Sequence, residues 1–142
     1  MAGRSGCCGV IHLPRKRMPE RVYRVVMDRA EDMAGWPACE VMIPGVCGGL
    51  AEHWHHRQLR SQGGEHVVVN GLGICHDCHD YVHGHTAGSY DNGWLVHGWD
   101  DPADEPVLRR GRWVLLHEDG TTTEVEKNEG IERADAAGGT SD

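Results

Sequence analysis

The sequence predicts a small α+β protein with an N-terminal helix, a central region rich in Cys and His, and a C-terminal β-rich extension. Three observations predict this fold class: apolar residues at helical spacing between positions 19 and 34, a concentration of Cys and His between positions 39 and 85, and short apolar runs separated by Asp- and Gly-rich turns thereafter. A chain of 142 residues with 39% hydrophobic residues and 20 Gly suits one domain with a thin core.

The first helix is expected from about Pro19 to Ala34. Proline suits a first turn, apolar residues recur at helical spacing, and Gly35 suits the position just after the last turn. The arginines of this segment, including Arg29, are expected on its solvent side. Residues 1–18 show no apolar period and contain three consecutive basic residues, so we expect them to form a flexible basic arm.

The central region is expected to form two short strands and a second helix. Residues 50–56 suit an extended segment, residues 62–64 a turn, and the β-branched run at 66–69 the second strand of a hairpin. From Cys75 to His85, the spacing of Cys, His, Tyr and Val is typical of a helix of two to three turns.

The C-terminal part is expected to form a short antiparallel β extension over residues 86–125. Its expected strands are 94–96, 106–108, 112–117 and 121–125, separated by turns rich in Asp and Gly. The final stretch, residues 126–142, is acidic and rich in Gly and Ala, and we expect it to be disordered.

Charge is distributed unevenly along the chain. The formal net charge is −8, but residues 1–84 carry nine Lys or Arg against nine Asp or Glu, so the acidic excess lies after residue 84. An acidic net charge argues against nucleic-acid binding, unless the chain contains a specific site for it. No apolar run is long enough to span a membrane and no export signal is evident, so we expect a cytoplasmic protein without a membrane partner.

Four cysteines predict a structural zinc site, because zinc prefers four soft ligands brought together from two turns of the chain. The two pairs are Cys39 with Cys47 and Cys75 with Cys78. The second pair has the short C-x-x-C spacing, whereas the first is wider but contains a Pro-Gly turn that can bring its thiols together. In a reducing compartment, these thiols are better interpreted as metal ligands than as disulfides. Cys7 and Cys8, in the arm, have no assigned role.

A second metal site is predicted by the histidines, eight of which lie between positions 53 and 85. His79 and His83 are four residues apart, so on a helix they share a face and can chelate one ion. A third ligand comes from His55 or His53, which would share one face of an extended strand, and we favour His55. The adjacent His56 would then stay free to act as a base near neutral pH.

These motifs, in this order, resemble the HNH endonuclease family, particularly its zinc-bearing, phage-type members. The resemblance covers about residues 20–85 and depends on the segment AEHWHHRQLRSQGG at 51–64, on Asn70, and on CHDCHDYVH at 75–83. It implies a nuclease domain over residues 19–85 with a ββα-metal (His-Me finger) core, in which two strands and one helix surround a divalent cation beside a four-cysteine structural zinc site.

The resemblance also implies roles for individual residues. By position these are His56 as general base, Asn70 as the residue that fixes the loop and helps to orient that base, His55, His79 and His83 as ligands of the catalytic cation, and Cys39, Cys47, Cys75 and Cys78 as zinc ligands. The sequence departs from a basic nuclease in one respect: no Lys or Arg lies between positions 61 and 84. Arg57 and Arg60 are therefore the expected phosphate contacts near the metal.

The expected function is that of a metal-dependent DNA endonuclease that hydrolyses phosphodiester bonds by nicking or double-strand cleavage. Zn²⁺ is expected in the structural site and Mg²⁺ or Mn²⁺ in the catalytic site, although an all-His site would hold Zn²⁺, Ni²⁺ or Co²⁺ more tightly. DNA is the expected partner. The phage-type resemblance also suggests a place beside a packaging terminase or another phage protein, in the cytoplasm of a bacterial host.

Two other function classes compete with the nuclease. A non-catalytic zinc module that binds nucleic acid or protein is favoured by the acidic C-terminal part, but a purely structural site does not need His56. The run Cys75-His-Asp-Cys78-His79 also matches a c-type haem attachment motif, which is used outside the cytoplasm and leaves the other Cys and His unexplained. The chain contains no His-Glu-x-x-His motif, so a zinc protease is not indicated.

Overall fold

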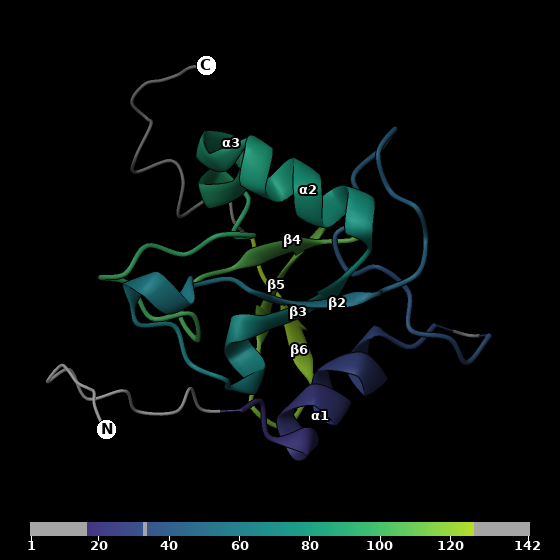
Figure 1. Ribbon diagram of the computed structural model, residues 1–142, viewed down its shortest axis with the longest axis horizontal. Coiled ribbons are helices and arrows are strands. Elements are labelled where there is room, and N and C mark those ends of the chain that lie inside the picture. Colours follow the sequence, from purple (N-terminus) through teal and green to yellow (C-terminus); the bar gives the residue numbers. More distant parts are fainter. Residues whose placement is uncertain (1–16, 33, 127–142) are drawn as a thin grey trace, which may run out of the picture.

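The computed structural model describes residues 17–32 and 34–126 (Figure 1). The helices are α1 (Glu20–Ala30), α2 (His76–Gly84) and α3 (Thr86–Asp91), with short 3₁₀ turns η2 (Arg60–Gln62) and η3 (Val68–Asn70). The strands are β2 (His53–His56), β3 (Gly71–Ile74), β4 (Val107–Arg109), β5 (Arg112–Leu116) and β6 (Thr122–Glu124). The fold is therefore α+β. Apart from Arg17, Met18 and Glu126, the expected arm and tail lie outside the described residues, as do Cys7 and Cys8.

An antiparallel hairpin of β2 and β3 lies at the centre, with α2 on one side and α1 on the other (Figure 1). His55 pairs with Leu72 and His56 with Gly71, so successive residues of β2 face opposite helices. The His55 ring packs against two histidines of α2, and Trp54 packs against Val22 and Val26 of α1. The hairpin thus separates two layers of side chains.

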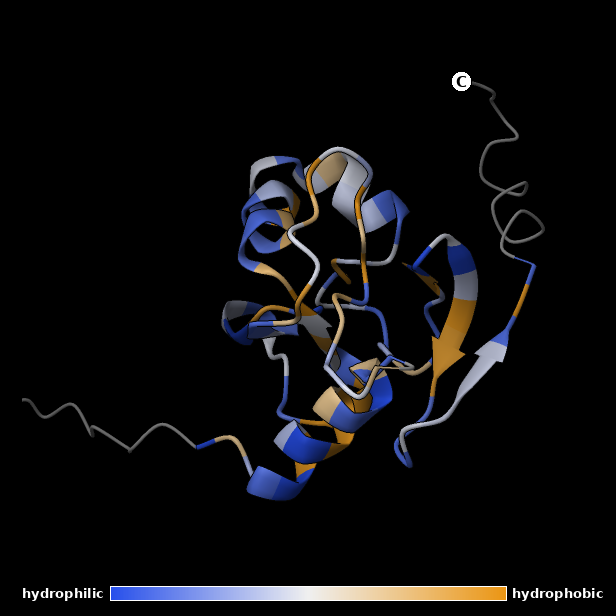
Figure 2. Cartoon of the chain, turned by 90° about the vertical axis from the view of Figure 1, so that its right-hand side faces the viewer, coloured by the Kyte–Doolittle hydropathy of each residue, from blue (hydrophilic) through white to orange (hydrophobic). Residues whose placement is uncertain are grey.

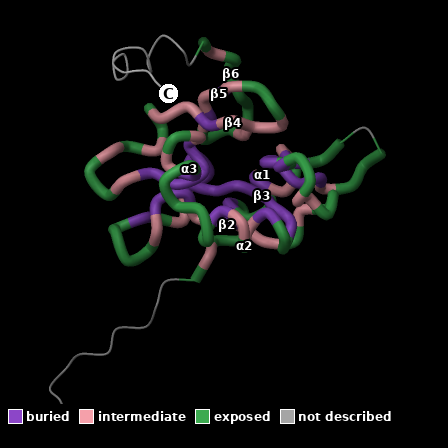
Figure 3. Tube along the Cα trace, turned by 90° about the horizontal axis from the view of Figure 1, so that it is seen from above, coloured by how far each residue is buried: buried purple, intermediate pink, exposed green. Residues whose placement is uncertain are grey.

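The second strand of the hairpin is not the expected valine run at 66–69. Val68 and Val69 begin a 3₁₀ turn whose backbone N–H groups donate to the Glu118 carboxylate, and the strand follows at 71–74. Glycine is required there, because a Cβ on Gly71 would lie 2.2 Å from the Trp54 ring. Figure 3 shows β3 buried along its length. Close packing of Trp54 and α1 therefore decides the strand position over β propensity.

The first helix begins at Glu20, next to the expected Pro19, but ends at Ala30 instead of Ala34. Glu31 adopts an extended conformation, and the Ala30 carbonyl oxygen accepts from the Ala38 N–H at 2.9 Å and from the Arg110 guanidinium at 2.7 Å. One face carries the buried apolar residues Val22, Val26 and Ala30, visible as a hydrophobic stripe at the bottom of Figure 2. Both the loop that follows and Arg110 of the C-terminal part therefore contribute hydrogen bonds at the end of this helix.

The C-terminal part forms a three-stranded antiparallel sheet in the order β4-β5-β6, as expected, but begins with a helix. The expected strand at 94–96 is instead a buried segment after α3 that forms no sheet strand. Val107, Val114 and Leu116 of the sheet share one hydrophobic core with Ile74 and Val82 of the hairpin and α2. The sheet is consequently part of the main core. No helix among the described residues is both long and apolar enough to cross a membrane.

A buried ionic network joins α1, β3 and the C-terminal sheet through Glu40. Its fully buried carboxylate accepts hydrogen bonds from Arg29 at 2.7 and 2.8 Å and from Arg109 at 2.6 Å. Burial raises the pKa of Glu40, but the two guanidinium groups outweigh it and lower the pKa. The expectation that Arg29 faces solvent is wrong: its side chain is 2% exposed, because it neutralises this carboxylate.

Replacing Glu40 by Gln is expected to lower the free energy of unfolding by about 3 kcal/mol, because it leaves two guanidinium groups buried without a counter-charge. Urea denaturation followed by circular dichroism measures the loss. Glu20→Gln is the matched control, since Glu20 forms an exposed ion pair with Arg24 and should contribute less than about 1 kcal/mol. Equal denaturation midpoints for the two variants would contradict the assigned role of Glu40.

Candidate metal centres

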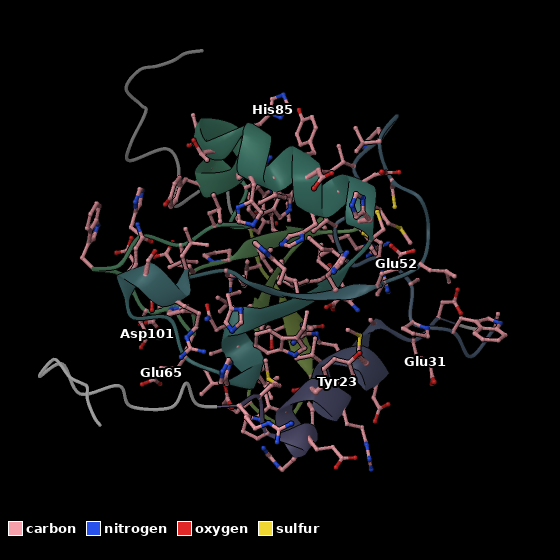
Figure 4. All side chains as sticks on the ribbon, viewed as in Figure 1. Tyr23, Glu31, Glu52, Glu65, His85 and Asp101 are labelled. Atoms are coloured by element: carbon pink, nitrogen blue, oxygen red, sulfur yellow. The ribbon has the colours of Figure 1, made fainter. Side chains whose placement is uncertain are left out.

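The four predicted cysteines come together between the 39–49 loop and the start of α2. Their Sγ atoms all lie within 4.8 Å of one another, and those of Cys47 and Cys75 are 3.9 Å apart. A tetrahedral zinc with Zn–S bonds of about 2.3 Å places its sulfurs about 3.8 Å apart. Figure 4 shows sulfur atoms gathered at the N-terminal end of α2. The group could therefore hold a metal ion such as zinc.

Backbone N–H groups surround these sulfurs in the way that stabilises thiolates. Cys75 accepts from Gly48 at 3.2 Å and from Cys78 at 3.3 Å, while Gly49 donates to Cys47 at 3.3 Å. Burial opposes ionisation of Cys75, but these hydrogen bonds outweigh it and lower the pKa of the thiol to about 7. Burial raises the pKa of Cys47 to about 11 in the absence of a cation. A cation would therefore complete a site whose donors are already oriented.

The second group of possible ligands consists of His55, His79 and His83, also with all three ligand nitrogens within 4.8 Å. His79 and His83 stand one turn apart on α2, and their Nε2 atoms are 3.2 Å apart. Two tetrahedral ligands at about 2.1 Å from one ion would be about 3.4 Å apart. His53, the alternative strand residue, lies 5.1 Å from His79 between ring centroids and is not a member of this group.

The tautomer of His55 is fixed by a main-chain carbonyl. His55 is 1% exposed, and its Nε2 lies 2.7 Å from the Trp94 carbonyl oxygen, so this nitrogen carries the proton and donates. The lone pair is consequently on Nδ1, which is free to bind a cation. Trp94 is itself held by Ser89, whose carbonyl accepts from the Trp94 N–H at 2.9 Å. This orientation of a ligand by its other ring nitrogen is typical of metal-binding histidines.

Burial favours the neutral form of His55 and His79, which is the protonation state that binds metals. It lowers the pKa of His55 to about 3, and the neighbouring His79 and His83 act in the same direction. Burial, with His83 and His53 adding to it, also lowers the pKa of His79. The exposed His83 leaves one side of the group open to solvent. The three residues thus provide a partly accessible set of nitrogen ligands.

Asn70 closes the loop that follows β2. Its Oδ1 accepts from the Gln58 N–H at 2.7 Å, and its Nδ2 donates to the carbonyls of Gln58 and Glu65 at 3.1 and 3.0 Å. Asn70 is fully buried, so all of these bonds are shielded from water. The side chain therefore fixes the 58–65 loop, as expected, although it acts on the backbone after His56 and not on its ring.

His56 lies on the face of β2 opposite the three metal-ligand candidates. Its Nε2 is 3.0 Å from His66 Nδ1, and His66 Nε2 is 2.5 Å from Arg60 Nη1. Because arginine only donates, His66 Nε2 must accept, so His66 Nδ1 carries the proton that is donated to His56. Burial, with the neighbouring His66 and Arg60 acting in the same direction, lowers the pKa of His56 to about 4. His56 is therefore a neutral imidazole with its proton on Nδ1.

The assignment of Arg57 to DNA binding is wrong. Arg57 is fully buried, and its guanidinium donates to the carbonyls of Gly93, Val69, Pro102 and Glu105 at 2.7–3.1 Å. A guanidinium that satisfies four main-chain acceptors cannot reach a phosphate, so it joins the loops around the hairpin. Arg60 is exposed and remains available to an anion.

Comparisons of the chain with models of protein families, with curated proteins and with solved structures found no match.

Proposed function

We propose that this chain is a metal-dependent DNA endonuclease that hydrolyses phosphodiester bonds. The observation that carries the proposal is the His55–His79–His83 group, in which His55 is oriented by the Trp94 carbonyl beside a separate four-cysteine site. If the protein needed a metal site only for structural stability, the four-cysteine group would already provide one. The order of two strands and one helix around the histidines supports the resemblance to HNH nucleases and a ββα-metal core.

Each part of the site has a chemical role in phosphodiester hydrolysis. His55, His79 and His83 would hold a divalent cation, which would supply a Lewis acid to stabilise negative charge on the phosphate. His56 is neutral and takes the proton of the attacking water. Asn70 holds the loop after His56 in place, and Arg60 contacts a phosphate on the strand.

The position of His56 constrains where the substrate lies. His55 and His56 are adjacent, but their side chains face opposite sides of β2. Since β2 ends at His56, a phosphate that reaches both must lie across the C-terminal end of the strand. After the end of β2, Arg60 is the first basic residue in the sequence that is exposed to solvent. We infer that the scissile bond crosses this end of the hairpin.

The three nitrogen ligands also favour one class of cation. Imidazole suits Zn²⁺, Ni²⁺ and Co²⁺, whereas Mn²⁺ and Mg²⁺ prefer oxygen ligands and Mg²⁺ also retains several waters. The described residues place no carboxylate in this group. We therefore propose that a transition metal supports cleavage better than Mg²⁺.

Conversion of supercoiled plasmid to open-circular and linear DNA tests the proposed function. We expect the wild type to cleave when Mn²⁺, Ni²⁺, Co²⁺ or Zn²⁺ is added, and His79→Ala to be inactive because its two remaining ligands hold the cation weakly. Omission of the cation is the negative control, since a chelator would also strip the four-cysteine site and unfold the protein. His85→Ala is the matched variant, because this exposed histidine of the α2–α3 junction lies outside the group.

Absence of cleavage with every cation, from folded protein that contains zinc, would contradict the proposal. A non-catalytic zinc-binding module for nucleic acid or protein would then be the better explanation. Cleavage by His79→Ala at the wild-type rate would place the activity elsewhere in the chain.

A further inference from the structure

Two adjoining pockets lie on either side of the loop at residues 63–67. One has a volume of about 380 Å³ and the other about 460 Å³, and both are lined by Gly63, Glu65 and Val67. Small-ligand sites in proteins typically have volumes of about 300–1,000 Å³. We name the first the aromatic pocket, because it contains Trp99, and the second the basic pocket, because it contains Arg17 and Arg60.

The aromatic pocket contains the outer ring of a three-ring stack. Tyr90 and His97 stack at 3.9 Å between centroids with an interplanar angle of 2°, and Trp99 stacks on His97 at 4.5 Å and 5°. Trp99 is 81% exposed, although an indole is among the largest apolar side chains. Its inner face is covered by His97, so a flat, exposed surface remains for another ring.

The backbone on both sides of Trp99 is hydrogen-bonded to the loop that Asn70 fixes. Gln58 Nε2 donates to the carbonyls of His97 and Asp100 at 2.9 and 2.8 Å, and the Asp100 N–H donates back to His97 at 3.0 Å. Gln58 is in turn hydrogen-bonded through its backbone to Asn70. The exposed ring is therefore prepared for a ligand at little further cost in conformational entropy.

The two pockets differ in charge. The basic pocket has the guanidinium groups of Arg17 and Arg60 beside the His66 ring, which suits a phosphate, together with the Glu65 carboxylate that it shares with the aromatic pocket. The charged residues of the aromatic pocket are Glu65, Asp100 and Asp101, and Figure 4 shows Glu65 and Asp101 at the same edge of the molecule. None of these three carboxylates forms an ion pair with a described residue. They suit a group that donates N–H hydrogen bonds.

We propose that the two pockets together bind one nucleotide of an unpaired DNA strand, with its phosphate in the basic pocket and its base stacked on Trp99. A nucleotide has the required anionic end and a flat end whose N–H groups can meet carboxylates. In a duplex both faces of a base are covered by its neighbours, so only an unpaired base can stack on the indole. The inference rests on the proposed function and specifies its substrate class as single-stranded or locally unpaired DNA.

Fluorescence anisotropy with a labelled ten-nucleotide single strand and with a labelled blunt-ended duplex tests this proposal. Binding is measured without added cation or chelator, so that the cysteine site stays loaded and no cleavage intervenes. We expect Trp99→Leu to weaken single-strand binding about 5- to 100-fold and to leave duplex binding unchanged. Arg60→Gln should reduce the slope of log Kd against log salt by about 0.7 for the single strand.

Trp36→Leu is the matched control, because Trp36 is 63% exposed but lines neither pocket. Unchanged single-strand affinity in Trp99→Leu, or equal losses for single strand and duplex, would overturn the proposal. If Trp99→Leu lost affinity for a labelled oligo-arginine peptide but kept its affinity for DNA, the aromatic pocket would be a site for cations. That result would overturn the proposal. Because no cleavage is required, a Trp99-dependent preference for single strands stands even if the plasmid assay fails.

Discussion

Replacing Cys78 by Ser is expected to unfold the domain and to abolish zinc binding by the four-cysteine group. Cys78 is fully buried, and its Sγ belongs to the four-cysteine group and to the main hydrophobic core. A hydroxyl binds zinc poorly, and structural zinc contributes about 10–16 kcal/mol in small domains. This exceeds or equals the whole stability of a typical domain, which is about 5–15 kcal/mol. Far-UV circular dichroism and zinc content per chain measure the outcome.

The control is Cys8→Ser, which changes a cysteine outside the described residues and should keep the wild-type spectrum and zinc content in the 39–78 site. His83→Ala is a second control, because it alters the histidine group alone and should leave the cysteine-bound zinc in place. A folded Cys78→Ser variant without zinc would show that packing alone holds this part of the core.

The two groups of metal-ligand candidates could be predicted from the sequence because their spacing depends on local geometry. Residues i and i+4 of any helix share a face, which brings His79 and His83 together, and a Cys-x-x-Cys turn at a helix start brings two thiols together. The choice between His53 and His55 required the tertiary structure, since both face α2 from the same strand. Nothing in the sequence indicates that the Trp94 carbonyl orients His55, because every residue has a backbone carbonyl.

The strand at 71–74 and the burial of Arg57 were missed for related reasons. Valine propensity favours 66–69, but a strand that packs under Trp54 needs glycine, and that contact joins residues far apart in the sequence. An arginine two residues after a candidate metal ligand suits a phosphate contact, yet here four carbonyls from distant loops surround it. Local patterns therefore predict which residues cluster, whereas long-range packing decides which of them reach the surface.

Replacing His56 by Ala is expected to reduce cleavage about 100- to 10,000-fold, the contribution of a positioned general base, while both metal sites stay loaded. His56 is not among the seven residues of the two groups, so its loss removes no ligand. Single-turnover cleavage of labelled DNA and metal content per chain separate the two effects. Loss of metal from His56→Ala would instead identify it as a ligand.

The contact between His56 and His66 makes this prediction sharper. In the described arrangement, the basic nitrogen of His56 accepts a hydrogen bond from His66, whose own Nε2 lone pair points to Arg60. A water can reach His56 Nε2 only if His66 moves, which a phosphate bound by Arg60 would favour by drawing the guanidinium away. His66→Ala should therefore retain cleavage if His56 is the base. If His66→Ala is inactive and His56→Ala is active, the base is His66, and the role that the sequence motif assigns to position 56 belongs ten residues further along the chain.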